Sequence, residues 1–130
     1  MREPSSEKST ALLETARMTP VDQAGRRLTE IVGGDIAVFV VGFAGPSGVD
    51  VDRWFESVDP ADEFVRLRVY GVWVAVSLLS DRYDDATAKS WLFGVNSDLG
   101  ERSPADVIRE LEDRDVMCRV ITAARKSVEN

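Results

Sequence analysis

Histidine is absent from this chain of 130 residues, and its absence removes several kinds of active site. Serine and cysteine triads of the usual kind need an imidazole as general base, and many catalytic zinc centres are ligated by imidazole nitrogen. Neither kind of site can be built without histidine. Much enzyme chemistry is therefore excluded, and we predict no catalytic residues, no metal site and no cofactor.

Cysteine is nearly absent as well, because Cys118 is the only one in the sequence. A single cysteine cannot form a disulfide within the chain. Its neighbours Val116, Met117 and Val120 are apolar, which indicates that Cys118 is a small buried side chain. We expect a protein of the reducing cytoplasm.

The sequence also lacks a long apolar run and a signal peptide. Its longest apolar run, residues 69–79, is too short to span a bilayer and includes Gly71 and Ser77. We therefore expect a soluble protein that does not cross a membrane. The formal net charge of −7 predicts an acidic surface, which repels nucleic acid and anionic membranes on average and suits a basic partner.

At this length the chain is expected to form one compact domain, or two small helical units that share a core. Residues 1–18 are predicted to be a flexible tail, because the first ten are mostly polar, although Leu12, Leu13 and Ala16 could form a short helix from residue 11 on. Residues 19–80 are predicted to form a helical region that resembles a helix-turn-helix. Residues 81–130 are predicted to form a second helical unit.

The region 19–80 contains two segments whose secondary structure is ambiguous. Residues 36–43 are β-branched and aromatic and would be a strand by propensity alone. A glycine-bearing loop at 45–48 and an apolar helical face in 49–55 favour a helix-turn-helix instead. Residues 66–79 are predicted to belong to a long buried helix, since they are apolar on almost every side. We predict an all-α fold, with an α+β fold as the alternative if 36–43 and 66–79 are strands.

The C-terminal region has clearer signals. Asp84 and Asp85 place acids at a helix start, and Gly94 is expected to end that helix. A loop rich in Asn, Ser, Asp and Gly follows, and Ser103–Pro104 then begins a new helix with an N-cap hydroxyl and a proline in the first turn. Two helices joined by a loop are therefore predicted.

This pattern resembles the C-terminal toxin-binding domain of the Xre/MbcA/ParS antitoxin family. The resemblance covers about the last third of the chain, and Val116 is expected to close the helix that follows Pro104. The family often has a glycine soon after the proline-started helix, whereas this chain has Arg109–Glu112 there. The residues that carry the resemblance are Trp91, Leu92, Asn96, Leu99, Gly100, Ser103, Pro104, Val107, Ile108 and Val116.

The resemblance implies an antitoxin that blocks the active site of a RES-domain toxin, an enzyme that consumes NAD. It also implies a homodimer, for which the apolar residues 38–43 could supply the interface. Residues 119–130 would reach into the toxin's pocket. The candidate partner-binding residues are Asn96, Leu99, Arg102, Arg109, Arg119, Arg125 and Lys126.

Other functions are less well supported. A DNA-binding regulator is the main alternative, but residues 35–59 contain one arginine and five acids, and an acidic recognition helix loses the phosphate contacts that bind DNA. Arg66 and Arg68 are interpreted as part of a solvated helix face.

The glycine spacing at 42–48 matches no nucleotide-binding motif, so a turn is preferred. The acids at 110–115 are interpreted as an exposed, salt-bridged helix.

Overall fold

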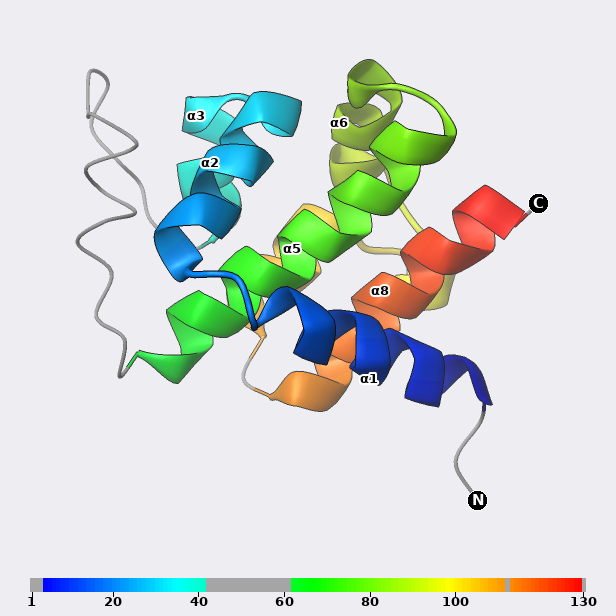
Figure 1. Cartoon of the computed structure of the whole chain (residues 1–130). Helices are drawn as coiled ribbons and strands as arrows, with labels where there is room; N and C mark the ends of the chain where they lie inside the picture. The colour runs from blue at the N-terminus through cyan, green and yellow to red at the C-terminus, as the bar shows by residue number, and fades with distance from the viewer. Residues whose placement is uncertain (1–3, 42–61, 112, 130) are drawn as a thin grey trace.

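The computed structural model describes residues 4–41, 62–111 and 113–129 (Figure 1). Over these ranges the backbone forms helices and no strand, so the predicted all-α fold is confirmed. The α+β alternative is excluded for residues 36–40 and 66–79, which are helical. The elements are α1 (Pro4–Ala16), α2 (Val21–Val32), α3 (Gly34–Val40), α5 (Glu63–Arg82), α6 (Asp85–Phe93), the 3₁₀ helix η1 (Ser97–Leu99), α7 (Pro104–Glu110) and α8 (Arg114–Glu129).

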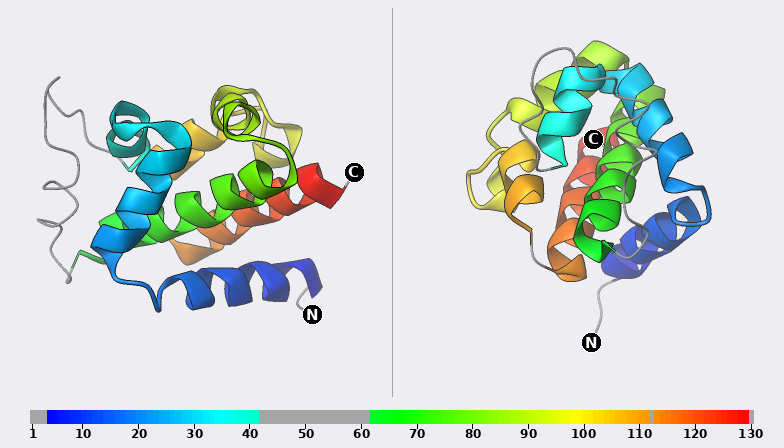
Figure 2. Two further views of the ribbon diagram at one scale, coloured as in Figure 1. Left: turned by 45° about the horizontal axis from the view of Figure 1, so that its top comes forward. Right: turned by 90° about the vertical axis from the view of Figure 1, so that its left-hand side faces the viewer.

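Helix α5 is the buried spine of the molecule, as predicted. Asp62 begins it by accepting a hydrogen bond from the backbone N–H of Val65 at 3.1 Å. Helix α8 lies alongside α5, with α1 below the pair and α2, α3 and α6 above them (Figure 2, left). Because neighbours cover it on several sides, α5 is stable despite its many valines, which favour strands.

Gly71 lies at a close contact between α5 and α8. A methyl group on Gly71 would lie 2.0 Å from Sδ of Met117, which is fully buried on α8. The missing side chain therefore leaves the space that the Met117 thioether fills. This packing explains a glycine in the interior of a helix, where it otherwise lowers stability.

The prediction of a flexible tail over residues 1–18 is wrong for most of this segment. Residues 4–16 form α1, whose Leu13 is fully buried. Ser9 Oγ lies 2.7 Å from Thr122 Oγ1 on α8, and Arg17 forms an ion pair with Glu63 at 3.1 Å. Nothing in the sequence indicated this helix contact, because Ser9 is small and polar and its partner Thr122 lies 113 positions away.

The predicted elements between residues 84 and 104 are present. Asp84 caps α6 by accepting from the backbone N–H of Thr87 at 2.7 Å, and the helix ends before Gly94. Ser103 caps α7 by accepting from the backbone N–H of Asp106 at 3.2 Å. The prediction that Val116 closes a helix is wrong, because α7 already ends at Glu110 and Val116 lies in the first turn of α8.

The chain breaks between α7 and α8 without the glycine that is common at helix ends. Arg68 on α5 satisfies carbonyl groups at the end of α7 instead. Its guanidinium donates to the carbonyl oxygens of Ile108 at 3.2 Å and Leu111 at 3.3 Å. Asp113 then caps α8 by accepting from the backbone N–H of Val116 at 2.9 Å. The interpretation of Arg68 as part of a solvated face is therefore wrong.

One hydrophobic core joins the predicted regions 19–80 and 81–130. Side chains from both regions belong to it, and the boundary falls inside the last turn of α5. The proposed loop at 45–48 and the second helix of the helix-turn-helix at 49–55 lie outside the described residues. No helix that the structure describes is long and apolar enough to cross a membrane.

Candidate protein-binding site

The loop between α6 and α7 is held in shape by Asn96. Its side-chain oxygen accepts from the backbone N–H of Asp98 at 2.9 Å, and its own N–H donates to the carbonyl of Arg102 at 3.1 Å. Leu99 is buried in the core beneath the loop. Asn96 and Leu99, two of the predicted partner-binding residues, therefore build the loop.

Gly100 and Glu101 turn the chain after η1. Both have positive φ, of 72° at Gly100 and 63° at Glu101. Glycine reaches this left-handed region without strain, whereas glutamate does so at a cost. The turn brings Arg102 back beside Asn96 in an isolated antiparallel bridge, so that Ser103 can begin α7.

Two predicted residues, Arg102 and Arg109, lie on the α7 side of the loop. Arg102 is exposed and forms an ion pair with Glu110. Arg109 donates a hydrogen bond to the backbone carbonyl of Phe39 on α3, and its guanidinium carbon lies 4.1 Å from the centre of the Phe39 ring. Arg109 thus joins α7 to α3 by a cation–π contact.

Phe39, Phe93, Val95 and Arg109 together form an exposed cluster that we call the aromatic patch. The rings of Phe39 and Phe93 lie 6.4 Å apart between their centres. Phe39 is 42% exposed, Phe93 47% and Val95 71%. The patch draws on α3, the end of α6 and α7, and it lies beside the loop that carries the family resemblance.

Sequence reasoning missed Phe39 and Phe93, although one signal was present. Trp91, Leu92 and Phe93 are consecutive, and successive helical residues point about 100° apart. All three cannot face a core on one side. Leu92 is buried, Trp91 is half-buried and donates to Ser127 Oγ at 3.2 Å, and Phe93 is left outward.

Residues 38–41, the described part of the segment predicted for a dimer interface, do not form a continuous apolar surface. Val38, Val40 and Val41 are buried in this chain, which leaves Phe39 as the exposed side chain among residues 38–41. Residues 42 and 43 lie outside the described ranges. A dimer interface built on the valines of this segment would require the core to open, and the homodimer itself stays a prediction.

The three basic residues predicted on α8 do not form one cluster. Arg119 is exposed. The Arg125 side chain is 12% exposed and turns toward α1, where it donates to Ser9 Oγ at 3.4 Å and pairs with Glu129 at 3.5 Å. Lys126 faces the loop and pairs with Asp98 at 3.4 Å. Arg125 and Lys126 therefore serve different sides of the helix.

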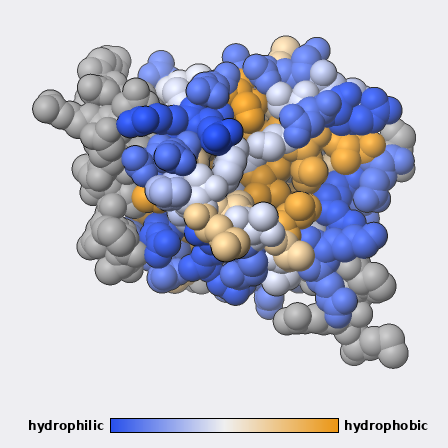
Figure 3. Space-filling model, in the orientation of Figure 1, coloured by the Kyte–Doolittle hydropathy of each residue, from blue (hydrophilic) through white to orange (hydrophobic). Residues whose placement is uncertain are grey.

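An open apolar groove of about 600 Å³ runs between α1 and α5, with Arg125 of α8 beside it. Figure 3 shows apolar side chains gathered on this face of the molecule. No predicted binding residue except Arg125 lies in this groove. It is lined by Lys8, Ala11, Leu12, Thr15, Ala16, Trp73, Val74, Ser77, Leu78, Asp81 and Arg125.

Titratable side chains do not gather into a reactive centre in the part of the chain that the structure describes, where no group of acids and cysteine could hold a metal ion. Cys118 is buried, as predicted. The pKa of Asp84 is lowered, first by a hydrogen bond from the Thr87 side chain and then by one from the Thr87 backbone. This shift belongs to a helix cap.

Comparisons of this chain with models of known protein families, with curated proteins and with solved structures found no match.

Proposed function

We propose that this protein is an antitoxin that binds a RES-domain toxin, which consumes NAD, and covers the toxin's active site. The proposal rests on the sequence resemblance and on the surface that the resembling segment presents. In this proposal the protein has no catalytic activity of its own. Its effect comes from occupying a surface that the toxin needs for its substrate.

The aromatic patch is the single observation that carries the proposal. Aromatic residues and arginine are the side chains that most often supply binding energy at protein interfaces, and exposed apolar clusters commonly mark such interfaces. Phe93 and Val95 belong to the segment that resembles the toxin-binding domain. Arg109 is one of the predicted contact residues, and it holds Phe39 at the same site.

The docking face therefore consists of the end of α6, the loop and the start of α7. Asn96 and Leu99 set the shape of this face from within, and Arg102 and Arg109 lie on its outside. Helix α8 is packed against α5 and α1 through Met117, Ala123 and Ala124. We therefore assign the contact with the toxin to the aromatic patch and not to the chain end, residues 119–130.

The proposal predicts that an adjacent reading frame encodes a RES-domain protein, and co-expression of that protein with this chain is the functional test. The wild-type protein should restore growth that the toxin arrests. Phe93→Asp should abolish the rescue, because a desolvated carboxylate at the centre of an interface costs several kcal/mol. Arg109→Asp should weaken the rescue as well.

Met18→Asp is the matched control, since Met18 is 86% exposed and lies in the turn between α1 and α2, away from the patch. It should rescue growth as the wild type does. Soluble yield and the thermal midpoint of each variant separate loss of binding from loss of folding. Arrest that persists with wild-type protein present, or full rescue by Phe93→Asp, contradicts the proposal.

The DNA-binding alternative gains no support from an observed element, because its recognition helix would occupy residues that lie outside the described ranges. Its test is retention of a promoter fragment at low salt, which the antitoxin proposal does not require.

A further inference from the structure

We infer that the groove between α1 and α5 binds a medium-chain carboxylate, with its alkyl chain along α5 and its carboxylate at Arg125 and Lys8. This site is separate from the aromatic patch and does not depend on the proposed function. The inference is drawn from the shape of the groove, its apolar lining and the charges at its rim.

The groove exists because α5 is apolar on more sides than its neighbours cover. Helix α1 is short and carries small residues, and its contact leaves Trp73, Val74 and Leu78 of α5 half-buried. Leu12 of α1 forms the opposite wall and is exposed. A volume of about 600 Å³ lies within the usual range for small-molecule sites, which are mostly apolar with a few polar groups.

The charges at the rim favour an anionic head group. Two of the three charged side chains that line the groove, Lys8 and Arg125, are basic, although the net charge of the chain is −7. The Arg125 side chain is only 12% exposed, and the lower dielectric of such a site strengthens the attraction between a guanidinium and a carboxylate. Arginine binds a carboxylate through two parallel hydrogen bonds.

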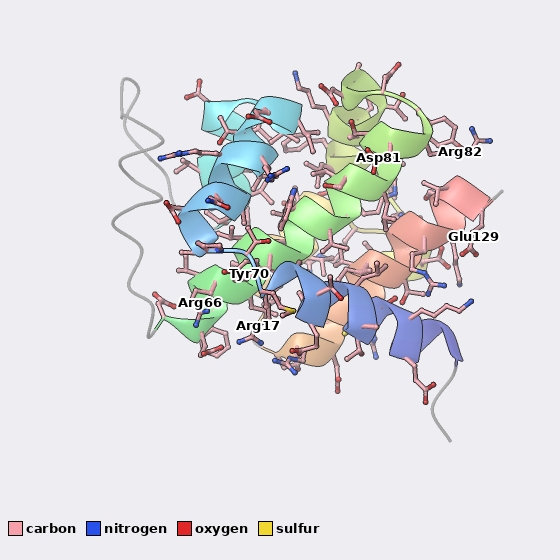
Figure 4. The ribbon with its side chains drawn as sticks, in the orientation of Figure 1. Arg17, Arg66, Tyr70, Asp81, Arg82 and Glu129 are labelled. Atoms are coloured by element: carbon pink, nitrogen blue, oxygen red, sulfur yellow. The ribbon has the colours of Figure 1, made fainter. Side chains whose placement is uncertain are left out.

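Glu129 is one of the partners of Arg125, and it is one that a ligand can replace. Glu129 is exposed, lies 3.5 Å from the guanidinium, and is close to the end of the chain (Figure 4). Because the Glu129 side chain is 62% exposed, this ion pair between neighbouring turns of α8 contributes little to stability. A ligand carboxylate that enters from the groove would compete with Glu129 for the same donors.

Asp81 limits the charge of the ligand. It lies toward the end of α5 (Figure 4) and also lines the groove. A second negative charge on the ligand would be repelled by the Asp81 carboxylate, while an alkyl chain would not be. The groove therefore suits a monocarboxylate with an apolar body and disfavours dicarboxylates and phosphate esters.

Titration of the intact protein with hexanoate, octanoate and decanoate, all below their micelle concentrations, tests the inference. Trp73 lines the groove, so its fluorescence should report binding, and Trp73→Phe should remove that signal. Affinity should rise roughly fourfold for each added methylene, as expected when the chain leaves water. Decanol and decylamine serve as head-group controls and should bind more weakly than decanoate.

Matched variants locate the head group and the chain. Arg125→Gln should weaken decanoate binding about tenfold and leave decanol binding unchanged. Lys126→Gln makes the same change at the next residue, which faces Asp98, and should have no effect. Glu129→Gln should strengthen decanoate binding, because it removes the competing carboxylate.

Leu78→Asp in the groove should abolish decanoate binding, whereas Phe93→Asp in the aromatic patch should leave it intact. Far-ultraviolet circular dichroism of each variant checks that the helices remain. Equal affinity for decanoate, decanol and decylamine would overturn the assignment of the head group to Arg125 and Lys8. Absence of binding by the folded wild-type protein, or binding that Leu78→Asp does not change, would overturn the site.

Discussion

Helix α8 packs against two neighbours in two different ways. Against α5 the contact is apolar and close, with Met117 filling the space above Gly71. Against α1 it is polar, with Ser9 Oγ 2.7 Å from Thr122 Oγ1 and Thr10 Oγ1 3.5 Å from Cys118 Sγ. The same helix therefore meets one partner through shape and the other through hydrogen bonds.

The two contacts differ in what they contribute to the fold: the free energy of unfolding in one case and the alignment of α1 along α8 in the other. An apolar contact gains free energy from the area that leaves water, in proportion to how completely it is filled. A buried hydroxyl pair gains little net free energy but costs more when one member is lost. We expect the α5 contact to stabilise the fold and the α1 contact to fix how α1 is aligned along α8.

Met117→Ala should produce the largest loss, because it empties the apolar contact. Removing a buried methionine side chain typically lowers the free energy of unfolding by about 2–5 kcal/mol. Chemical denaturation followed by circular dichroism measures the change. Met18→Ala, at an exposed position in a turn, should change stability by less than about 0.5 kcal/mol. If Met117→Ala lowers the free energy of unfolding no more than Met18→Ala does, the α5 contact is not the main stabilising contact of α8.

Gly71→Ala tests the same contact by overfilling it. A methyl group there meets Met117, which typically costs about 1–3 kcal/mol, while alanine regains about 1 kcal/mol of helix propensity. We expect a net loss of up to about 2 kcal/mol. Combining it with Met117→Ala should give less than the sum of the two losses, because the new methyl group then occupies part of the cavity. Strict additivity would show that Gly71 and Met117 are independent.

The elements that could be predicted from the sequence are those whose signals are local or apolar. The spine α5 was recognisable from its continuous apolar pattern, and α6 and α7 from their capping residues Asp84 and Ser103. These signals lie within a few residues of the helix that they define. Local chemistry therefore predicted most of the C-terminal half.

The features that sequence reasoning missed depend on partners far away in the chain. The polar residues of α1 gave no sign of a buried helix, because Ser9 is paired with Thr122 on α8. The chain ends α7 without a glycine, because Arg68 of α5 donates to the carbonyls of Ile108 and Leu111. In the candidate site, the arginine at 109 was predicted, whereas Phe39 was not, because only the fold brings α3 beside α7. Such pairs have no signature in one sequence.

Ser9→Ala tests the polar contact and should have a smaller effect than either change at the α5 contact. It removes the hydrogen bonds of Ser9 Oγ with Thr122 and Arg125. The Thr122 hydroxyl keeps its bond to the Cys118 carbonyl at 2.8 Å, and Arg125 keeps its ion pair with Glu129. We expect a loss of about 1 kcal/mol in the free energy of unfolding. Ser90→Ala on the exposed side of α6 is the control. If Ser9→Ala leaves the free energy of unfolding unchanged, the hydrogen bonds of Ser9 do not contribute to the contact between α1 and α8.

Asp84 provides a reference outside both contacts, and the effect expected there is the smallest. Hydrogen bonds from the Thr87 side chain and backbone lower the pKa of Asp84, so the folded state holds its carboxylate more strongly than the unfolded chain does. Stability from this cap is present above the ordinary aspartate pKa of about 3.9 and is lost as the pH falls through the lowered value.

Asp84→Asn should therefore unfold at a lower denaturant concentration than the wild type near neutral pH, and the two midpoints should converge as the pH falls below about 3.9. Thr87→Val removes the hydroxyl donor but keeps the backbone N–H, and it should reduce part of the pH dependence. Because the Asp84–Thr87 hydrogen bond is local to the start of α6, the Ser9→Ala and Met117→Ala losses should stay the same in an Asp84→Asn background. A difference between these losses in the two backgrounds would mean that the α6 cap is coupled to the packing of α8, and the two contacts could no longer be compared as independent.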